Sequence, residues 1–377
     1  MRKAGAGLVA VLILAGCAEA PATAREPAKT RKPAAQRSTK TQKPGASGEP
    51  VTRLLDAMAA VSGDGPAAAY FEYGEPARWS ELGVTAGSGG AAGRRWLPAT
   101  AWGFGELAPA AAGLPGVTGV APLAADRAIA IGVAPGQAFR FDGGAKESVV
   151  RSRLEGLGAA PRRIGGHDGL SFAPGADVNP LRPPVPVSGV TNQFNQVVVT
   201  GSTVAVAPGT GPLAAVLGGE RSLAGSEDHA AVGACLGDVA AATVTASQGS
   251  GAVTLYGVGL RRPANLGDRP VNVICVLPRQ ASVAAVKESF GTRLTTAATS
   301  RGGRAFGEFA GEITHDEVRR GDRTVLRATL TLTATPSVLF AAQLLQRGEL
   351  PFLADPAAPG DPAGLLTATP APGSPAR

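Results

Sequence analysis

Residues 324–334 read TVLRATLTLTA, and this stretch indicates the kind of fold that the chain adopts. Apolar and polar side chains alternate along it, which is the period-two pattern of a strand that buries one face. The apolar members of the pattern are Leu326, Ala328, Leu330 and Leu332. Gly321 and Asp322 come just before, and this pair favours a hairpin turn to an earlier strand. The stretch therefore predicts one arm of an antiparallel hairpin.

Helices are predicted around this strand. Thr335 and Pro336 are typical of a helix start, and Gly348 is typical of a helix end. Apolar residues also recur at helical spacing over 150–157 and, after a capping Ser282, over 283–294. Two compact apolar runs, 129–131 and 271–276, suit strands that are covered on both faces. The sequence therefore predicts an α+β fold with antiparallel sheets whose helices cover one face.

The order of predicted elements occurs twice. Residues 197–220 and 318–349 each read strand, glycine turn, strand, helix start and glycine stop. The turn glycines, Gly201 and Gly321, are 120 positions apart, whereas the preceding helices, at Val150 and Val286, are 136 apart. Because these offsets differ, the comparison depends on element order and not on a constant spacing. We expect an internal duplication, with halves at about 117–235 and 236–354.

Composition limits the class of protein. Of 377 residues, 44% are hydrophobic. The chain has 52 Gly and 31 Pro, a proportion below that of disordered low-complexity sequence, so it can fold. No apolar run reaches the length of about 18 residues that a membrane-spanning helix needs, which excludes a multi-span membrane protein. We expect a body over 51–354, large enough for one large domain or two modest ones.

The first residues have the pattern of a signal peptide. Arg2 and Lys3 precede an apolar stretch over 7–16, which is too short to span a bilayer as a helix. Its end, Leu14-Ala15-Gly16-Cys17, resembles the lipobox of bacterial lipoproteins. The resemblance implies that residues 1–16 are a signal peptide and that the Cys17 thiol carries acyl chains such as palmitate. Two such chains would hold the protein firmly on a membrane.

Both ends of the chain are predicted to be disordered. Residues 17–50 contain neither aromatic nor large aliphatic side chains, and 355–377 are dominated by Pro, Ala and Gly. Seven basic and three acidic residues in 18–50 account for most of the net charge of +7, so the body is nearly neutral. We therefore expect a basic tether next to a lipid surface, and no binding of nucleic acid.

Two further cysteines, Cys235 and Cys275, form an even pair in a chain predicted to be exported. A disulfide bond is the expected outcome in such a compartment. Two buried, unreactive thiols are the alternative.

Large aromatic residues are concentrated near the front of the body. If these side chains lie on the surface, they are typical of a recognition site, because Tyr and Trp combine a large contact area with a polar group. An aromatic core beneath a loop-rich segment is the alternative. The candidate binding residues are Tyr70, Tyr73, Trp79, Trp96 and Trp102.

The motifs for catalysis are weak. His167, His229 and His315 each adjoin an aspartate, but their spacing does not require a shared zinc or general-base site. A G-x-G-x-x-A match begins at Gly209, and Pro212 explains it as a helix start. An Arg-Gly-Asp tripeptide at 320–322 suits the predicted hairpin turn. We expect neither a metal ion nor a cofactor.

Together these features predict a non-catalytic binding or assembly module of the cell envelope, lipid-anchored on the extracytoplasmic face of the cell membrane. Its expected partner is an envelope protein or a small apolar ligand. One alternative is a carrier that holds a lipid or a wall precursor in an apolar cavity between the two halves. The other is an extracytoplasmic hydrolase that uses the His/Asp pairs.

Overall fold

The computed structural model describes residues 52–84, 90–173, 183–247 and 251–357. The predicted signal peptide, the lipobox with Cys17, the whole tether and most of the C-terminal tail lie outside these residues. None of the helices in the described ranges has the length and apolarity needed to cross a membrane.

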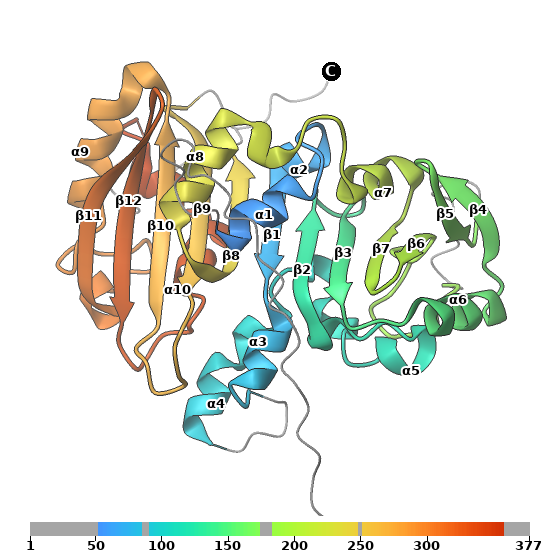
Figure 1. The fold of residues 1–377 in the computed structure, drawn as a ribbon. Coiled ribbons are helices and arrows are strands. Elements are labelled where there is room, and N and C mark those ends of the chain that lie inside the picture. The colour runs from blue at the N-terminus through green and yellow to red at the C-terminus, as the bar shows by residue number, and fades with distance from the viewer. Residues whose placement is uncertain (1–51, 85–89, 174–182, 248–250, 358–377) are drawn as a thin grey trace, which may run out of the picture. The chain divides into compact units, whose positions relative to one another are not determined.

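Within the described residues, twelve strands form one antiparallel sheet in the order β11-β12-β10-β9-β8-β1-β2-β3-β7-β6-β5-β4 (Figure 1). The α+β class with antiparallel strands is thus confirmed. The strands are β1 (Tyr70–Gly74), β2 (Ala125–Ile131), β3 (Ala138–Gly143), β4 (Ala160–Ile164), β5 (His167–Ser171), β6 (Gln196–Thr200), β7 (Thr203–Ala207), β8 (Val239–Ala246), β9 (Val253–Arg261), β10 (Val271–Pro278), β11 (Ala310–Arg320) and β12 (Arg323–Leu332).

Helices of 4 to 11 residues cover this sheet. They are α1 (Arg53–Ala59), α2 (Pro66–Ala69), α3 (Pro76–Glu81), α4 (Ala91–Trp96), α5 (Leu114–Thr118), α6 (Glu147–Gly156), α7 (Thr210–Leu217), α8 (Glu227–Leu236), α9 (Val283–Arg293), α10 (Phe340–Gln346) and α11 (Glu349–Ala354). The 3₁₀ helices η1 (Leu97–Ala101) and η2 (Gly105–Ala110) lie between α4 and α5.

The strand order repeats in the two halves of the sheet. The first copy runs β1-β2-β3-β7-β6 and the second runs β8-β9-β10-β12-β11, with α6 and α9 at corresponding places along the chain. The copies join where β1 pairs with β8. The repeat begins at Tyr70, earlier than position 117, where the sequence comparison began its first half. The hairpin β4–β5 has no counterpart between α9 and β11, and this extra hairpin explains why the two offsets differ.

One face of the sheet, here called the α8 face, is covered by α1, α2, α7 and α8. A single apolar cluster extends along it from β12 to β4 and crosses the junction between the copies. At that junction Phe71 and Tyr73 of β1 and Val244 of β8 are almost fully buried. The α8 face therefore has one continuous core.

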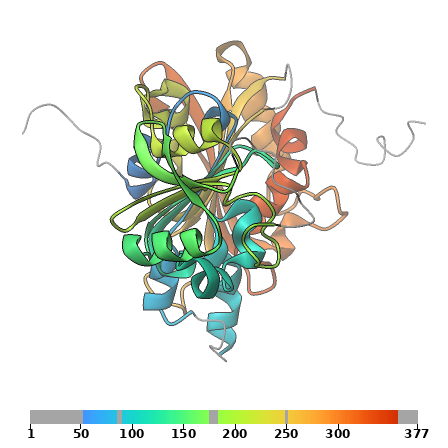
Figure 2. The ribbon, with the colours of Figure 1, turned by 90° about the vertical axis from the view of Figure 1, so that its right-hand side faces the viewer.

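The opposite face, here called the α10 face, has three separate clusters, one of which is built around Trp79 of α3 and Trp96 of α4 beside β8 and β9. Helices α5 and α6 cover strands of the first copy, and α9, α10 and α11 cover strands of the second. Figure 2 shows the red α10 and α11 on the opposite side of the sheet from the blue α1. The expectation that helices cover only one face is therefore wrong: the sheet lies between two layers of helices. Hydrophobic spacing shows that a helix has an apolar side, but it does not show which face of the sheet that side covers.

The predicted disulfide between Cys235 of α8 and Cys275 of β10 is confirmed. Helix α8 lies very close to the sheet beside this bond. A Cβ atom at Gly257 of β9 would lie only 2.5 Å from Cγ1 of Val232. Glycine at this position therefore allows the close approach that the disulfide completes.

Helix α10 begins at Phe340, later than the predicted start at Pro336. The buried Asn272 side chain explains this start. Its Nδ2 donates to the Val338 carbonyl at 2.8 Å, and its Oδ1 accepts from the Ala341 N–H at 2.8 Å. A residue from a distant strand thus satisfies the backbone groups at the start of the helix.

Candidate functional site

A groove of about 470 Å³ lies on the α10 face where the two copies meet. We call it the central groove. The first copy and its loops contribute Tyr70, Trp102 and Val133. The second copy and the segment after it contribute Thr243, Thr245, Ala246, Ser247, Tyr256, Ala342, Leu345, Gln346, Gly348 and Pro351. This volume is within the range of small-molecule sites, about 300–1,000 Å³.

Register in the sheet aligns the strand wall of the groove. Tyr70 of β1 pairs with Thr245 of β8, and Thr245 pairs with Tyr256 of β9. Directly paired residues point to the same face of a sheet. Three hydroxyl groups from three neighbouring strands therefore line one wall.

A buried carboxyl group holds Tyr70 in place. The Tyr70 hydroxyl donates to Oε2 of Glu72 at 2.6 Å, and the Gly103 N–H donates to Oε1 of Glu72 at 2.7 Å. Burial raises the pKa of Glu72 above its ordinary value of 4.5, although these hydrogen bonds oppose the shift. Burial and the nearby Glu72 also raise the pKa of the Tyr70 phenol. Tyr70 therefore enters the groove as a neutral hydroxyl.

Tyr256 is also a neutral phenol. Burial raises its pKa to about 12, a hydrogen bond with Ser247 opposes the shift, and the nearby Asp355 carboxylate adds to it. The strand wall thus offers uncharged hydroxyl groups.

The facing wall is apolar. Ala342 and Leu345 project from α10, and Pro351 lies in α11. Val133, in the loop after β2, is 61% exposed, the highest value among the exposed large hydrophobic residues in the described part of the chain. Val133 and the exposed Pro351 therefore leave apolar surface open to solvent at the groove.

The structure divides the five aromatic residues that the sequence grouped as a binding surface. Tyr70 and Trp102 line the central groove. Tyr73, Trp79 and Trp96 are buried, with exposed fractions of 1%, 0% and 0%. Trp79 and Trp96 stack with ring centroids 5.6 Å apart and form a core of their own beside β8 and β9.

Trp102 owes its position to two contacts. Its indole Nε1 donates to the Ala242 carbonyl of β8 at 2.9 Å. Its backbone carbonyl lies directly over Gly74 of β1, where a Cβ atom would overlap it. The segment between η1 and η2 can therefore lie against the sheet and present the indole to the groove.

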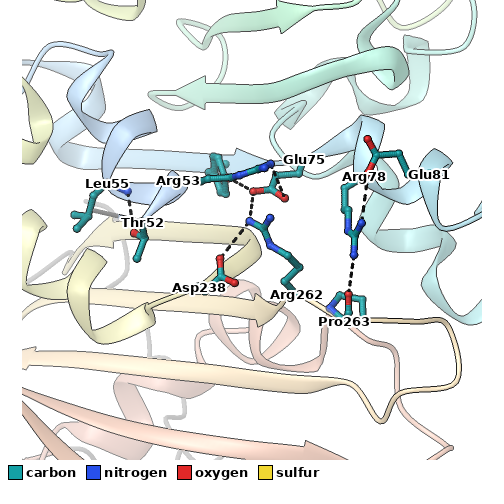
Figure 3. Close-up of polar contacts among 10 residues, drawn as sticks. Thr52, Arg53, Leu55, Glu75, Arg78, Glu81, Asp238, Arg262 and Pro263 are labelled. Carbon is teal, nitrogen blue, oxygen red and sulfur yellow. Dashed lines mark hydrogen bonds and ion pairs between the residues drawn. The ribbon is translucent and has the colours of Figure 1, made fainter. Parts of the chain in front are cut away.

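A second polar cluster surrounds Glu75, whose side chain is 1% exposed (Figure 3). Oε1 of Glu75 accepts from the Tyr73 hydroxyl and from Nη2 of Arg262, the latter at 2.5 Å. Arg53 lies 3.9 Å from Oε2, and Arg262 also pairs with Asp238 at 3.2 Å. Burial raises the pKa of Glu75, opposed by the hydrogen bond from Tyr73 and by Arg262 and Arg53.

This cluster adjoins a hollow of about 540 Å³, and ion pairs join most of its charged side chains. Arg262 has two carboxylate partners, and Arg78 pairs with Glu81 at 3.4 Å. A hollow of about 440 Å³ beside α9 and β11 is similar, because Lys287 pairs with Glu317 and Arg327 with Asp316. Ion pairs thus join the charged side chains at both places, although Oε2 of Glu75 and the Nε atoms of Arg78 and Arg262 are buried without a hydrogen-bond partner.

The three histidines do not meet. His167 lies on β5, His229 on α8 and His315 on β11. Nine strands of the sheet separate β5 from β11, so no shared site of these side chains is assembled. Within the described ranges, no group of three His, Cys, Asp or Glu residues is placed to hold a metal ion.

The two short motifs have structural explanations. Gly209-Thr210-Gly211 precedes and starts α7, which follows the antiparallel strand β7, whereas a dinucleotide fingerprint needs a parallel unit. Arg320-Gly321-Asp322 spans the turn between β11 and β12.

Sequence reasoning missed Thr245, Tyr256 and Leu345 in the groove. Each belongs to a strand or helix whose pattern is that of an ordinary core element, and only the register across β1, β8 and β9 unites them. Comparison with protein-family models, curated proteins and solved structures finds no match for this chain. The function is therefore inferred from the residues that line the groove.

Proposed function

We propose that this protein is an exported lipoprotein anchored through Cys17 on the extracytoplasmic face of the cell membrane. Its body is a non-catalytic binding module, and the ligand or partner group enters the central groove. The observation that carries the proposal is the groove itself, with uncharged hydroxyl groups on one wall and exposed apolar side chains on the other.

Two features favour binding at this place. Strands and loops of the first copy and strands and helices of the second both line the groove, so it is a consequence of the fold and not of one loop. Its polar lining is held by Glu72 and by the backbone of 103–105, which fixes the geometry before a ligand arrives. Preorganised sites lose less entropy on binding.

The test uses the full chain, released from bacterial membranes in lipid nanodiscs, and a dodecyl glucoside with a photoreactive diazirine on its chain. After illumination, mass spectrometry maps the labelled peptides. We expect labelling of α10 and α11, reduced about tenfold in Val133→Asp because a charge then borders the apolar wall.

Val149→Asp is the matched control. Val149 is also an exposed valine, 37% accessible, but it lies on α6 away from the groove. Labelling should be unchanged in this variant. Equal labelling of Val133→Asp and the wild type, or labelling scattered over the surface, would reject the groove as the binding site.

The anchor is tested separately. Cys17→Ala should abolish incorporation of radioactive palmitate, because the thiol that accepts the acyl chain is gone. Cys235→Ser should retain the label, since Cys235 belongs to the disulfide. Palmitate found on the Cys17→Ala protein would refute lipidation at this position.

A further inference from the structure

The lining of the central groove has a charge pattern that restricts its ligand. Among the described residues, no Lys, Arg, Asp or Glu side chain lines it. The nearest carboxyl groups are those of Glu72, bonded to Tyr70, and Asp355, close to Tyr256. An anionic group in the groove would therefore lose its water without gaining a cationic partner, which is costly.

The two walls differ in kind. Thr243, Thr245 and Ser247 supply aliphatic hydroxyls from the end of β8, beside the phenols of Tyr70 and Tyr256. The Tyr70 hydroxyl donates to Glu72 and the Thr245 hydroxyl donates to the Ala69 carbonyl, so their oxygens remain as acceptors and match a ligand that donates hydroxyl protons. Ala342, Leu345 and Pro351 on the other side offer only apolar surface. A ligand that satisfies both walls has a polar part and an apolar part.

We propose, on the basis of the binding function argued above, that the groove takes an uncharged amphiphile, an alkyl or acyl chain joined to a hydroxyl-rich head such as a sugar. The head contacts the strand wall and the half-buried face of Trp102, and the chain contacts α10, α11 and Val133. Lipids with a phosphate head should bind more weakly, because the described residues of the lining include no cationic side chain.

Cationic heads are a separate case, because aromatic rings attract quaternary ammonium groups when several surround one point. Here Tyr256 is buried with an exposed fraction of 3%, and no ring contact joins it to Tyr70 or Trp102 among those found in the described residues. Because Tyr256 is almost fully buried, its ring offers little face to a cation, and the neutral head fits better.

The experiment compares three photoreactive probes with the same dodecyl chain and with glucoside, phosphate or trimethylammonium heads, on the full chain in nanodiscs. We expect the glucoside to label the groove about tenfold more than either charged probe, which corresponds to about 1.4 kcal/mol. Equal or stronger labelling by the phosphate or the trimethylammonium probe overturns the proposal while leaving a binding groove in place. Absence of labelling by all three probes rejects the binding function itself.

A charge placed in the groove should switch this preference. Gln346, exposed on α10, lines the groove, whereas Gln343 on the same helix faces a different hollow. Gln346→Lys should increase labelling by the phosphate probe severalfold, and Gln343→Lys should leave it unchanged. An equal response of the two variants would show that general surface charge, and not the groove lining, governs head selection.

Discussion

Strand β1 presents different chemistry to the two faces of the sheet. Toward the α8 face it points Phe71, packed with Ile131 of β2 and Val244 of β8 in the continuous core. Toward the α10 face it points Tyr70 and Glu72, which lie between two separate core clusters. The same five residues thus join the copies on one side and leave a groove between them on the other.

The difference arises from the helices. Helices α1, α2 and α8 bring apolar side chains to the junction on the α8 face, whereas on the α10 face the core is divided into separate clusters, one of them formed by α3 and α4 against β8 and β9. Helix α7 follows the last strand of the first copy, and α10 follows the last strand of the second. These two helices nevertheless cover opposite faces of the sheet. One face is therefore expected to carry stability and the other to carry recognition.

Phe71→Ala should have the largest effect on stability. Phe71 is fully buried at the junction, and removing such a ring leaves a cavity that costs about 3–5 kcal/mol. Tyr70→Phe, one residue away on the other face, should cost about 1 kcal/mol, the value of one hydrogen bond. Guanidinium unfolding of the two variants gives the comparison, and similar losses would contradict the division between faces.

Removal of the disulfide should come next. The double variant Cys235→Ser, Cys275→Ser frees α8 from β10, and we expect a loss of about 2–4 kcal/mol. Thermal unfolding with and without reductant measures it. If the wild-type melting temperature did not respond to reduction, α8 would be held by packing alone.

Asn272→Ala acts on the α10 face. The change leaves the Val338 carbonyl and the Ala341 N–H without their buried partner, at a cost of about 1–3 kcal/mol. Because α10 forms the apolar wall, probe labelling should fall as well. Asn265→Ala is the control, since its Oδ1 caps only an exposed turn, and a change within about 0.5 kcal/mol is expected there.

The smallest effect is expected for Glu72→Gln, and it should depend on pH. Burial raises the pKa of Glu72, so the folded state binds this proton more tightly than the unfolded state does. Its contribution to stability is complete below the ordinary pKa of 4.5 and is lost as pH rises through the raised value. Gln keeps the neutral form, so the variant should be more stable than the wild type at pH 7 and lose the advantage at acid pH.

Melting temperatures of both proteins between pH 4 and pH 8 provide the measurement. Glu75 also has a raised pKa and is unchanged in the variant, so some pH dependence should persist. Curves that differ most at acid pH would contradict the assignment.

Local sequence patterns predict those helices and strands that bury one apolar face or one continuous apolar run. The strand around Leu326, the buried run at 271–276, the helices α6 and α9 and the disulfide were all within reach of periodicity and cysteine counting. Packing decides what those patterns leave open. Asn272 lies 68 positions before Phe340, yet it determines where α10 begins.

The candidate site was predictable only in part for the same reason. Tyr70, Tyr73, Trp79, Trp96 and Trp102 look alike in the sequence. Their burial differs for three reasons. Successive side chains of β1 point to opposite faces, and Trp79 stacks on Trp96 in a buried core. The Trp102 indole is held at the groove by its hydrogen bond to a carbonyl of β8. The partners Thr245 and Tyr256 reach the groove through register between distant strands.

The pairing of β1 with β8 also determines the order in which the sheet can be completed. The chain is synthesised from its N-terminus, so β1, β2, β3, β6 and β7 all exist before β8 at 239–246 is made. Until then β1 is an open edge, whose free N–H and C=O groups can template pairing with any suitable strand. A crowded nascent population would therefore be prone to exchange second copies between molecules, giving interlocked dimers in which each β1 pairs with a neighbour's β8.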